Sequence, residues 1–100
     1  LMKIEAILRG GTSTDAAQTL FDEIRTIRGA SNKTVSLDEL FNERGRELYI
    51  EGWRRNDQVR FGKYASPYGF KTNTDAYRDV YPIPQSAIAS NPNLKQNEGY

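Results

Sequence analysis

The sequence predicts a mostly helical, all-α fold: a helical hairpin, then one long helix, then an extended, loop-rich C-terminal tail. Three segments carry apolar residues at helical spacing on one face, namely residues 1–9, 13–28 and 37–61. Residues 62–100 contain all four prolines and a loop-like mixture of Gly, Asn, Thr and Asp. A chain of 100 residues has the length of one domain, and we expect 1–100 to form a single segment.

The first two helical segments are separated by glycines, which predicts an antiparallel hairpin. The apolar stripe of residues 1–9 stops at Gly10 and Gly11, which are typical of a helix C-terminus followed by a tight turn. The second segment follows the capping candidates at residues 12–14 and ends at Gly29. Because the chain starts inside a helical pattern, we expect a fragment whose upstream part completes the first helix.

The third segment has the clearest start signal in the chain. Ser36 and Glu39 have the spacing of a capping box, and no proline interrupts the sequence before Pro67. Gly45 and Gly52 lie seven residues apart on the apolar face. Since a glycine inside a helix costs about 1 kcal/mol relative to alanine, we expect close approach of a neighbouring backbone, that of the second helix.

Charged residues crowd the same segment. Arg44 and Arg55 fall on or beside its apolar face, and Glu47 and Glu51 occupy the adjacent strip. A buried guanidinium requires carboxylate partners, and Glu51 and Arg55 have the favourable i, i+4 order. We therefore predict a partly buried, structural lattice of ion pairs, with seven members: Arg44, Glu47, Glu51, Arg54, Arg55, Asp57 and Arg60.

Composition argues against several kinds of chemistry. The chain has no His and no Cys, so the commonest general base and the usual metal ligands are missing. The best catalytic candidate is the carboxylate pair of Glu47 and Glu51, but surrounding arginines make ion pairing the simpler interpretation. Four acids at helical spacing, Glu39, Glu43, Glu47 and Glu51, lack the accompanying His of helical-bundle metal sites. We predict no enzyme, no catalytic residue, no cofactor and no metal, and a net charge of +1 does not favour nucleic acid.

The aromatic loop after the third helix is the best candidate for ligand binding. Its four aromatic residues are Tyr64, Tyr68, Phe70 and Tyr77. Aromatic rings can stack on sugar rings while Asn, Asp and Arg bind the hydroxyls; the alternative, which we favour, is that these rings fasten the loop to the helices. Beyond this loop we expect an extended segment at residues 80–84, a short helical turn at 85–90 and a turn at 91–93.

Two stretches of the sequence resemble the C-terminal end of SusD/RagB-family proteins. The pattern R-x-x-E-x-x-x-E-G-x-R-x-x-D-x-x-R occurs at residues 44–60. The ending matches at YPIP (81–84), Asn91-Pro92, Leu94, Gln96-Asn97 and Gly99-Tyr100. Trp53, Ala87 and Glu98 depart from the residues usual in the family, and none of them affects the assignment.

The resemblance implies the C-terminal part of a longer surface lipoprotein of Bacteroidota with a body of TPR-like helix pairs. Such proteins bind oligosaccharides at the outer membrane and hand them to a SusC-like TonB-dependent transporter. The membrane is reached only through the parent's N-terminal lipid anchor, and no defined glycan-binding motif carries over to this chain. The alternative is a structural TPR-like interaction module without direct ligand contact. We also expect the isolated fragment to self-associate through uncovered apolar helix faces.

Overall fold

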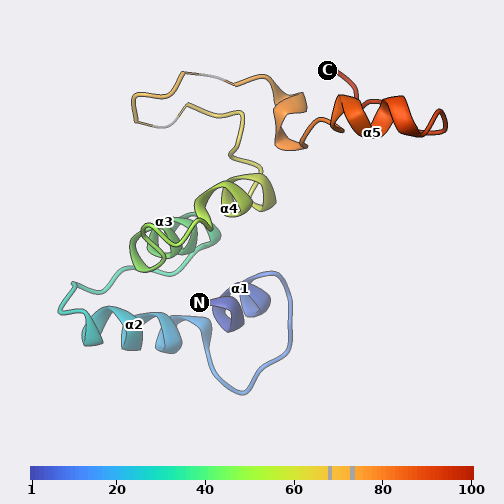
Figure 1. Cartoon of the computed structure of the whole chain (residues 1–100). Coiled ribbons are helices and arrows are strands. Elements are labelled where there is room, and N and C mark those ends of the chain that lie inside the picture. Colours follow the sequence, from blue (N-terminus) through green and yellow to red (C-terminus); the bar gives the residue numbers. More distant parts are fainter. Residues whose placement is uncertain (68, 73) are drawn as a thin grey trace. The chain divides into compact units, whose positions relative to one another are not determined.

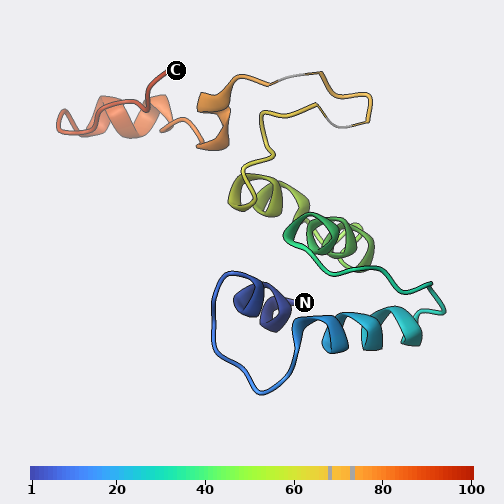
Figure 2. The same ribbon diagram turned by 180° about the vertical axis from the view of Figure 1, so that it is seen from behind.

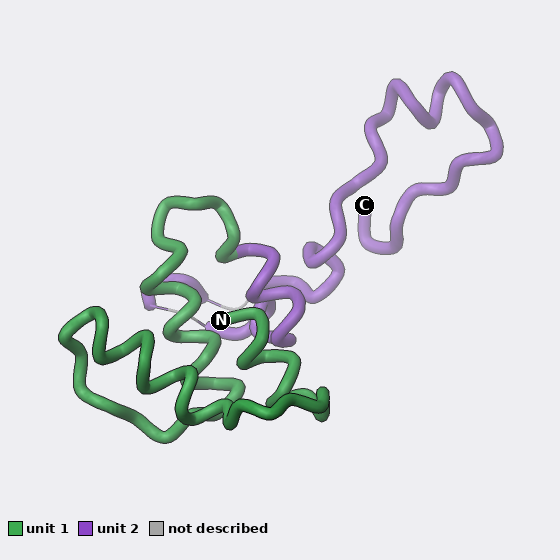
Figure 3. Tube along the Cα trace, turned by 90° about the horizontal axis from the view of Figure 1, so that it is seen from below, with its two compact units in different colours: residues 1–54 green, residues 55–100 purple. Residues whose placement is uncertain are grey.

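The computed structural model describes residues 1–67, 69–72 and 74–100. Its elements, in chain order, are α1 (Met2–Leu8), α2 (Ala17–Ile27), α3 (Leu37–Glu47), α4 (Arg54–Arg60), a 3₁₀ helix η1 (Ala76–Asp79) and α5 (Gln85–Ser90) (Figure 1). Within the described ranges the extended backbone amounts to one isolated bridge residue, so the predicted all-α class is confirmed. The chain divides into two compact units, residues 1–54 and residues 55–100 (Figure 3).

The core of the first unit is where its three full helices meet. Ile4, Phe21 and Leu40 come from α1, α2 and α3 and are almost completely buried. The helix α1 packs against both α2 and α3 and lies at the N-terminal end of α2 (Figures 1 and 2). Partly buried apolar residues surround these three side chains: Leu1, Leu8, Ala17, Leu20, Ile24 and Val35. The apolar faces predicted from the sequence therefore point inward, except at the end of α2, where Ile27 is 71% exposed.

The connection between α1 and α2 is longer than the predicted tight glycine turn. The helix α2 begins at Ala17 rather than at residue 13. The hydroxyl of Ser13 accepts a hydrogen bond from the backbone N–H of Asp15 at 3.1 Å, and the carboxylate of Asp15 pairs with Lys3. Local hydrogen bonds of this kind compete with helix formation, which explains why the capping candidates lie in the loop instead of starting the helix.

The predicted long third helix is broken, so its expected span of 37–61 is wrong. Its start is correct, because the hydroxyl of Ser36 caps α3 by accepting a hydrogen bond from Glu39 N at 3.1 Å. The helix ends at Glu47, and Ile50 and Gly52 then adopt left-handed φ values of 66° and 78°. A right-handed helix cannot continue through such residues, and glycine adopts this conformation without steric cost. A proline is therefore not needed to end the helix here.

The two glycines of this segment have different roles, and neither matches the predicted approach of the second helix. Gly52 is needed for its φ value, since a Cβ atom there would meet nothing within 4 Å. Gly45 makes room for a side chain, because its Cβ would lie 2.7 Å from Nη1 of Arg54. This guanidinium donates to the carbonyl of Phe41 at 2.7 Å and lies 3.7 Å from the centroid of the Phe41 ring. Arg54 thus folds back onto α3 in the space that Gly45 leaves open.

Replacing Gly45 with alanine tests this arrangement, because the change in the free energy of unfolding should have opposite signs with and without the Arg54 side chain. In most helices glycine to alanine stabilises by about 1 kcal/mol. Here we expect Gly45→Ala to destabilise the chain by about 1 kcal/mol, because the displaced Arg54 loses its bond to the Phe41 carbonyl. In the Arg54→Ala background the same change should stabilise by about 1 kcal/mol. Urea unfolding of the four chains measures both steps, and equal stabilisation in both backgrounds would show that Gly45 does not serve Arg54.

The second unit is held together mainly by side chains bonded to backbone. The predicted helical turn at 85–90 is confirmed as α5, and Leu94 N donates to the carbonyl of Asn91 at 3.1 Å in the predicted turn. Gln96 accepts from Ile83 N at 2.8 Å and donates to Ile83 O at 2.9 Å. The Gln96 side chain therefore makes with the Ile83 backbone the two hydrogen bonds that a neighbouring strand would make.

The last residues of the chain close against the same segment. Asn97 donates to the carbonyl of Tyr81 at 2.7 Å, and the Tyr100 hydroxyl donates to the carbonyl of Val80 at 2.9 Å. Gly99 lies directly against the ring of Tyr77, and any side chain at this position would collide with that ring. These contacts give a structural reason for the Gln-Asn and Gly-Tyr pairs at the end of the sequence.

Candidate functional site

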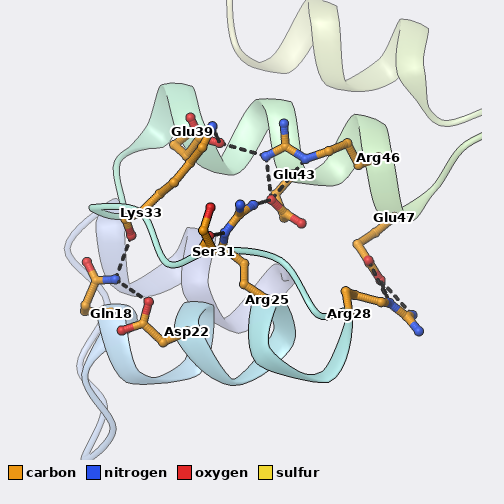
Figure 4. A network of polar contacts seen from close by, with 10 residues as sticks. All are labelled: Gln18, Asp22, Arg25, Arg28, Ser31, Lys33, Glu39, Glu43, Arg46 and Glu47. Atoms are coloured by element: carbon orange, nitrogen blue, oxygen red, sulfur yellow. Dashed lines mark hydrogen bonds and ion pairs between the residues drawn. The ribbon is translucent and has the colours of Figure 1, made fainter.

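A network of charged side chains joins α2, α3 and the loop between them (Figure 4). At its centre are Arg25 and Glu43, which are only 5% and 3% exposed. Nη1 of Arg25 lies 2.5 Å from Oε2 of Glu43, and Nε of Arg25 donates to the carbonyl of Ser31 at 2.6 Å. Glu43 also accepts from Arg46 at 2.5 Å. This buried carboxylate therefore has two guanidinium partners, and its charge is fully compensated.

The network continues outward to the loop before α3. Arg46 and Lys33 both donate to Oε1 of Glu39, at 2.7 and 3.0 Å. The amide of Gln18 in α2 donates to the carbonyl of Lys33 at 2.8 Å and accepts from Val35 N at 2.8 Å. Among the described residues, every buried polar side-chain atom has a hydrogen-bond partner. The network therefore links α2, the loop after it and α3, and its positive and negative side chains neutralise one another. We call this network the brace.

The sequence prediction missed both residues at the centre of this brace. Arg25 is not among the predicted site residues, and Glu43 enters the prediction only as one of four acids that lack the His of a metal site. A signal was present, because Arg25 follows Phe21 by four residues and Glu43 follows Leu40 by three. Positions at these spacings share the buried face of a helix.

The residues of the predicted ion-pair lattice are distributed over several different contacts. Glu47 pairs with Arg28, the residue that follows α2, and Nε and Nη2 of Arg28 donate to the two oxygens of Glu47 at 2.9 Å each. Asp57 is buried and pairs with Arg60 at 3.2 Å. Glu51 lies exposed in the break after α3, so the helical spacing that was expected to pair it with Arg55 does not exist.

The remaining arginines of the predicted lattice contact aromatic rings and carbonyl groups, or are buried. Arg54 stacks on Phe41 as described above. Arg44 is 6% exposed, which agrees with the predicted burial of its side chain. Arg55 donates to the carbonyls of Arg78 and Asp79 at 2.9 and 3.1 Å. The chain thus uses these arginines to fix backbone as well as to neutralise acids.

The pair of Glu47 and Arg28 should make stability depend on pH. The hydrogen bonds from Arg28 hold the pKa of Glu47 below its usual value. A carboxyl group with a lowered folded-state pKa stabilises the fold above its unfolded-state pKa of about 4.5, and this contribution disappears as the pH falls through the folded-state pKa. We expect the contribution to be about 0.2–1 kcal/mol, because the pair is solvent-exposed on the Arg28 side. Urea unfolding should show that the wild type is more stable than Glu47→Gln at pH 6 and that this difference disappears toward pH 2.5.

The candidate ligand-binding aromatics have different surroundings. The ring of Tyr64 has the Arg55 guanidinium at 5.0 Å and the Lys71 ammonium at 4.6 Å from its centroid. The ring of Tyr77 packs edge-on against Tyr100 with centroids 5.0 Å apart. Phe70 is completely exposed, and Tyr68 lies outside the described residues. Among the described candidates, Phe70 presents the most accessible ring.

Each unit contains a small cavity. In the first unit a mostly apolar cavity of about 280 Å³ is lined by Leu1, Met2, Arg44, Leu48 and Trp53. In the second unit a cavity of about 170 Å³ is lined by Val59, Gly62, Tyr64, Ala65, Ala76 and Asp79. The described part of the chain shows no cluster of acids that could hold a metal ion, and none of its helices is long and apolar enough to cross a membrane.

Comparison with known proteins decides the family. A sequence model described as the SusD family matches residues 1–100, which is the whole chain. The chain belongs to the SusD family. It is 39% identical, over 112 aligned residues, to the starch-binding protein SusD of Bacteroides thetaiotaomicron. The match covers 100% of this chain and 20% of that relative, so the chain spans about a fifth of the relative's length. The SusD-family resemblance read from the sequence is therefore confirmed.

Proposed function

We propose that the protein containing this chain is a non-catalytic, glycan-binding protein of the bacterial outer-membrane surface. The observation that supports this most strongly is the 39% identity, across the whole chain, to a starch-binding protein. The geometry agrees, because the two acids that would be candidates for catalysis do not form the helical pair that their spacing predicts. Glu47 is held by Arg28, and Glu51 lies in the break between α3 and α4. Two carboxylates flanking a substrate, as glycosidases require, are not formed by this pair.

The wider role follows from the family. We propose that the parent protein is a surface lipoprotein, held in the outer membrane by an N-terminal lipid, and that it passes oligosaccharides to a SusC-like TonB-dependent transporter. This chain supplies a braced helical part of that protein together with the closed C-terminal tail. The rival, a TPR-like interaction module without ligand contact, predicts no glycan binding and gains no support from a starch-binding relative.

A glycan array on the full-length parent protein tests the proposal. Neutral oligosaccharides should be retained, and incubation with them should release no reducing ends. Retention of no glycan, with the association to the transporter intact, would favour the interaction module. Release of reducing ends that disappears in Glu47→Gln would instead show a hydrolase and overturn the non-catalytic assignment.

We further propose that the isolated 100-residue chain self-associates. Met2, Tyr49, Ile50 and Trp53 are large apolar residues with exposed fractions between 49% and 87%. Tyr49, Ile50 and Trp53 lie in or next to the break after α3, and Met2 and Trp53 line the apolar cavity of the first unit. Large exposed apolar side chains at this end of the first unit favour association.

Light scattering at increasing protein concentration tests the self-association. We expect dimers or larger species for the wild type and a shift toward monomers for Ile50→Asn. Asparagine removes the apolar side chain and tolerates the left-handed backbone of residue 50. The matched control is Ile27→Asn at the end of α2, where the isoleucine is also exposed (71%). A wild-type chain that stays monomeric at high concentration would contradict the proposal.

A further inference from the structure

The cavity of the second unit is lined by small apolar residues, Tyr64 and one acidic residue, Asp79. Val59 comes from the last part of α4, Ala65 from the loop after it, and Ala76 and Asp79 from η1. Asp79 is exposed, and its carboxylate has no ion-pair or hydrogen-bond partner among the described residues. The neighbouring acid Asp75, which precedes η1, is paired with Arg78. Asp79 is therefore an acceptor that remains available to a ligand.

One guanidinium contacts two segments that line this cavity. Nη2 of Arg55 donates to the carbonyls of Arg78 and Asp79, at 2.9 and 3.1 Å, which holds the backbone that carries the carboxylate. The same guanidinium lies 5.0 Å from the centroid of the Tyr64 ring and 4.0 Å from that of Tyr81. Arg55 is thus a positioning residue, and a ligand entering the cavity meets walls that are already in place.

The loop that forms the remaining wall is also tied down. The ammonium of Lys71 donates to the carbonyl of Tyr64, and Thr74 N donates to the carbonyl of Ala65 at 3.2 Å. These bonds hold the backbone carbonyls of Tyr64 and Ala65. Binding would therefore require little ordering of this wall.

Size and chemistry limit what the cavity can hold. Its volume of about 170 Å³ lies below the range of roughly 300–1,000 Å³ that is usual for drug-sized ligands, so it suits one ring and not an extended chain. An ionised carboxylate accepts hydrogen bonds from hydroxyl groups and repels anions. Val59, Ala65 and Ala76 offer methyl groups to the C–H face of such a ring. These properties match a single neutral sugar ring.

We propose that this cavity is a subsite for one neutral pyranose ring of a bound glycan, with Asp79 accepting hydrogen bonds from its hydroxyls and Arg55 positioning the walls. The subsite rests on the proposed glycan-binding function. It differs from the aromatic candidates of the sequence prediction, because a carboxylate and three small apolar residues carry it. Tyr64 lines the cavity, but two cations already lie near its ring, so stacking on that ring is not its role.

The test is a titration of the isotope-labelled 100-residue chain, followed by NMR, with three neutral disaccharides: maltose, cellobiose and lactose. At least one should shift the amides of residues 59–65 and 76–79 selectively. Asp79→Asn should weaken that response by about tenfold or more, since the amide replaces an ionic acceptor. Ala76→Leu, which fills the cavity, should abolish it. Asp75→Asn makes the same chemical change outside the cavity and should leave the affinity within about twofold.

The outcomes separate this subsite from the proposed function. Shifts located elsewhere, an unchanged affinity in Asp79→Asn, or a preference for glucuronate over the neutral sugars would each overturn the subsite. If the full-length parent binds glycans and this chain responds to none of the three disaccharides, the subsite is wrong and the proposed function stands. If the parent itself binds no glycan, the proposed function fails first.

Discussion

Replacing Glu43 with alanine should destabilise the chain by about 3–5 kcal/mol, because the change leaves the Arg25 guanidinium buried without its carboxylate. Arg25 is 5% exposed, and among the described residues the carbonyl of Ser31, at 2.6 Å, would remain as its hydrogen-bond acceptor. Typical domains are stable by only about 5–15 kcal/mol, so a loss of this size would unfold a large fraction of the molecules on mild heating. Urea unfolding followed by circular dichroism measures the difference.

Two further variants show whether the loss comes from the buried charge. Lys33→Ala removes an exposed member of the same network and should cost about 0–1 kcal/mol. The double replacement of Arg25 by methionine and Glu43 by leucine removes both charges at once, and should recover most of the stability lost in Glu43→Ala. If Glu43→Ala costs no more than Lys33→Ala, the pair is not the structural centre that its burial indicates.

Arg44→Ala should also cost about 3–5 kcal/mol, because Arg44 is a second buried cation of α3. The side chain is 6% exposed and lines the apolar cavity with Leu48 and Trp53, so its alkyl stem contributes packing as well as charge.

The matched control for Arg44 lies two residues away on the same helix. Arg46 keeps 47% of its side chain exposed, and Arg46→Ala should cost about 1 kcal/mol. Thermal and urea unfolding of both variants give the comparison. A loss below about 0.5 kcal/mol in Arg44→Ala would mean that this arginine is solvated and that the predicted burial is not realised in solution.

The local features of the fold could be predicted from the sequence, because they depend on neighbouring residues. The cap at Ser36, the short helix α5 and the turn after Asn91 each need only a few adjacent side chains. The break after Glu47 could not, because it depends on two left-handed residues, and one of them is Ile50, a residue type that rarely adopts that conformation. Helical periodicity cannot detect such a residue when no proline marks it.

The partners of the charged residues could not be predicted either, because they come from other parts of the chain. Glu47 was expected to pair along its own helix, but its partner Arg28 is the residue that follows α2. Composition likewise identifies an aromatic loop, but it does not show which of the rings pack against other residues and which stay exposed. Tyr77 is closed against Gly99 and Tyr100, whereas Phe70 is exposed. Family resemblance identified the protein class correctly, although the motif that carries it spans a helix break and not one continuous helix.

One measurement tests most directly whether the charged helices brace a glycan-binding protein without taking part in binding. It is a calorimetric titration of the full-length parent protein, carrying Arg25→Met and Glu43→Leu, with the neutral oligosaccharide that the array identifies. We expect the double variant to be folded and to bind within about twofold of the wild-type affinity, a difference of less than about 0.5 kcal/mol. A loss of affinity beyond about tenfold in a protein with an unchanged circular dichroism spectrum would place the network in the binding site and contradict the account.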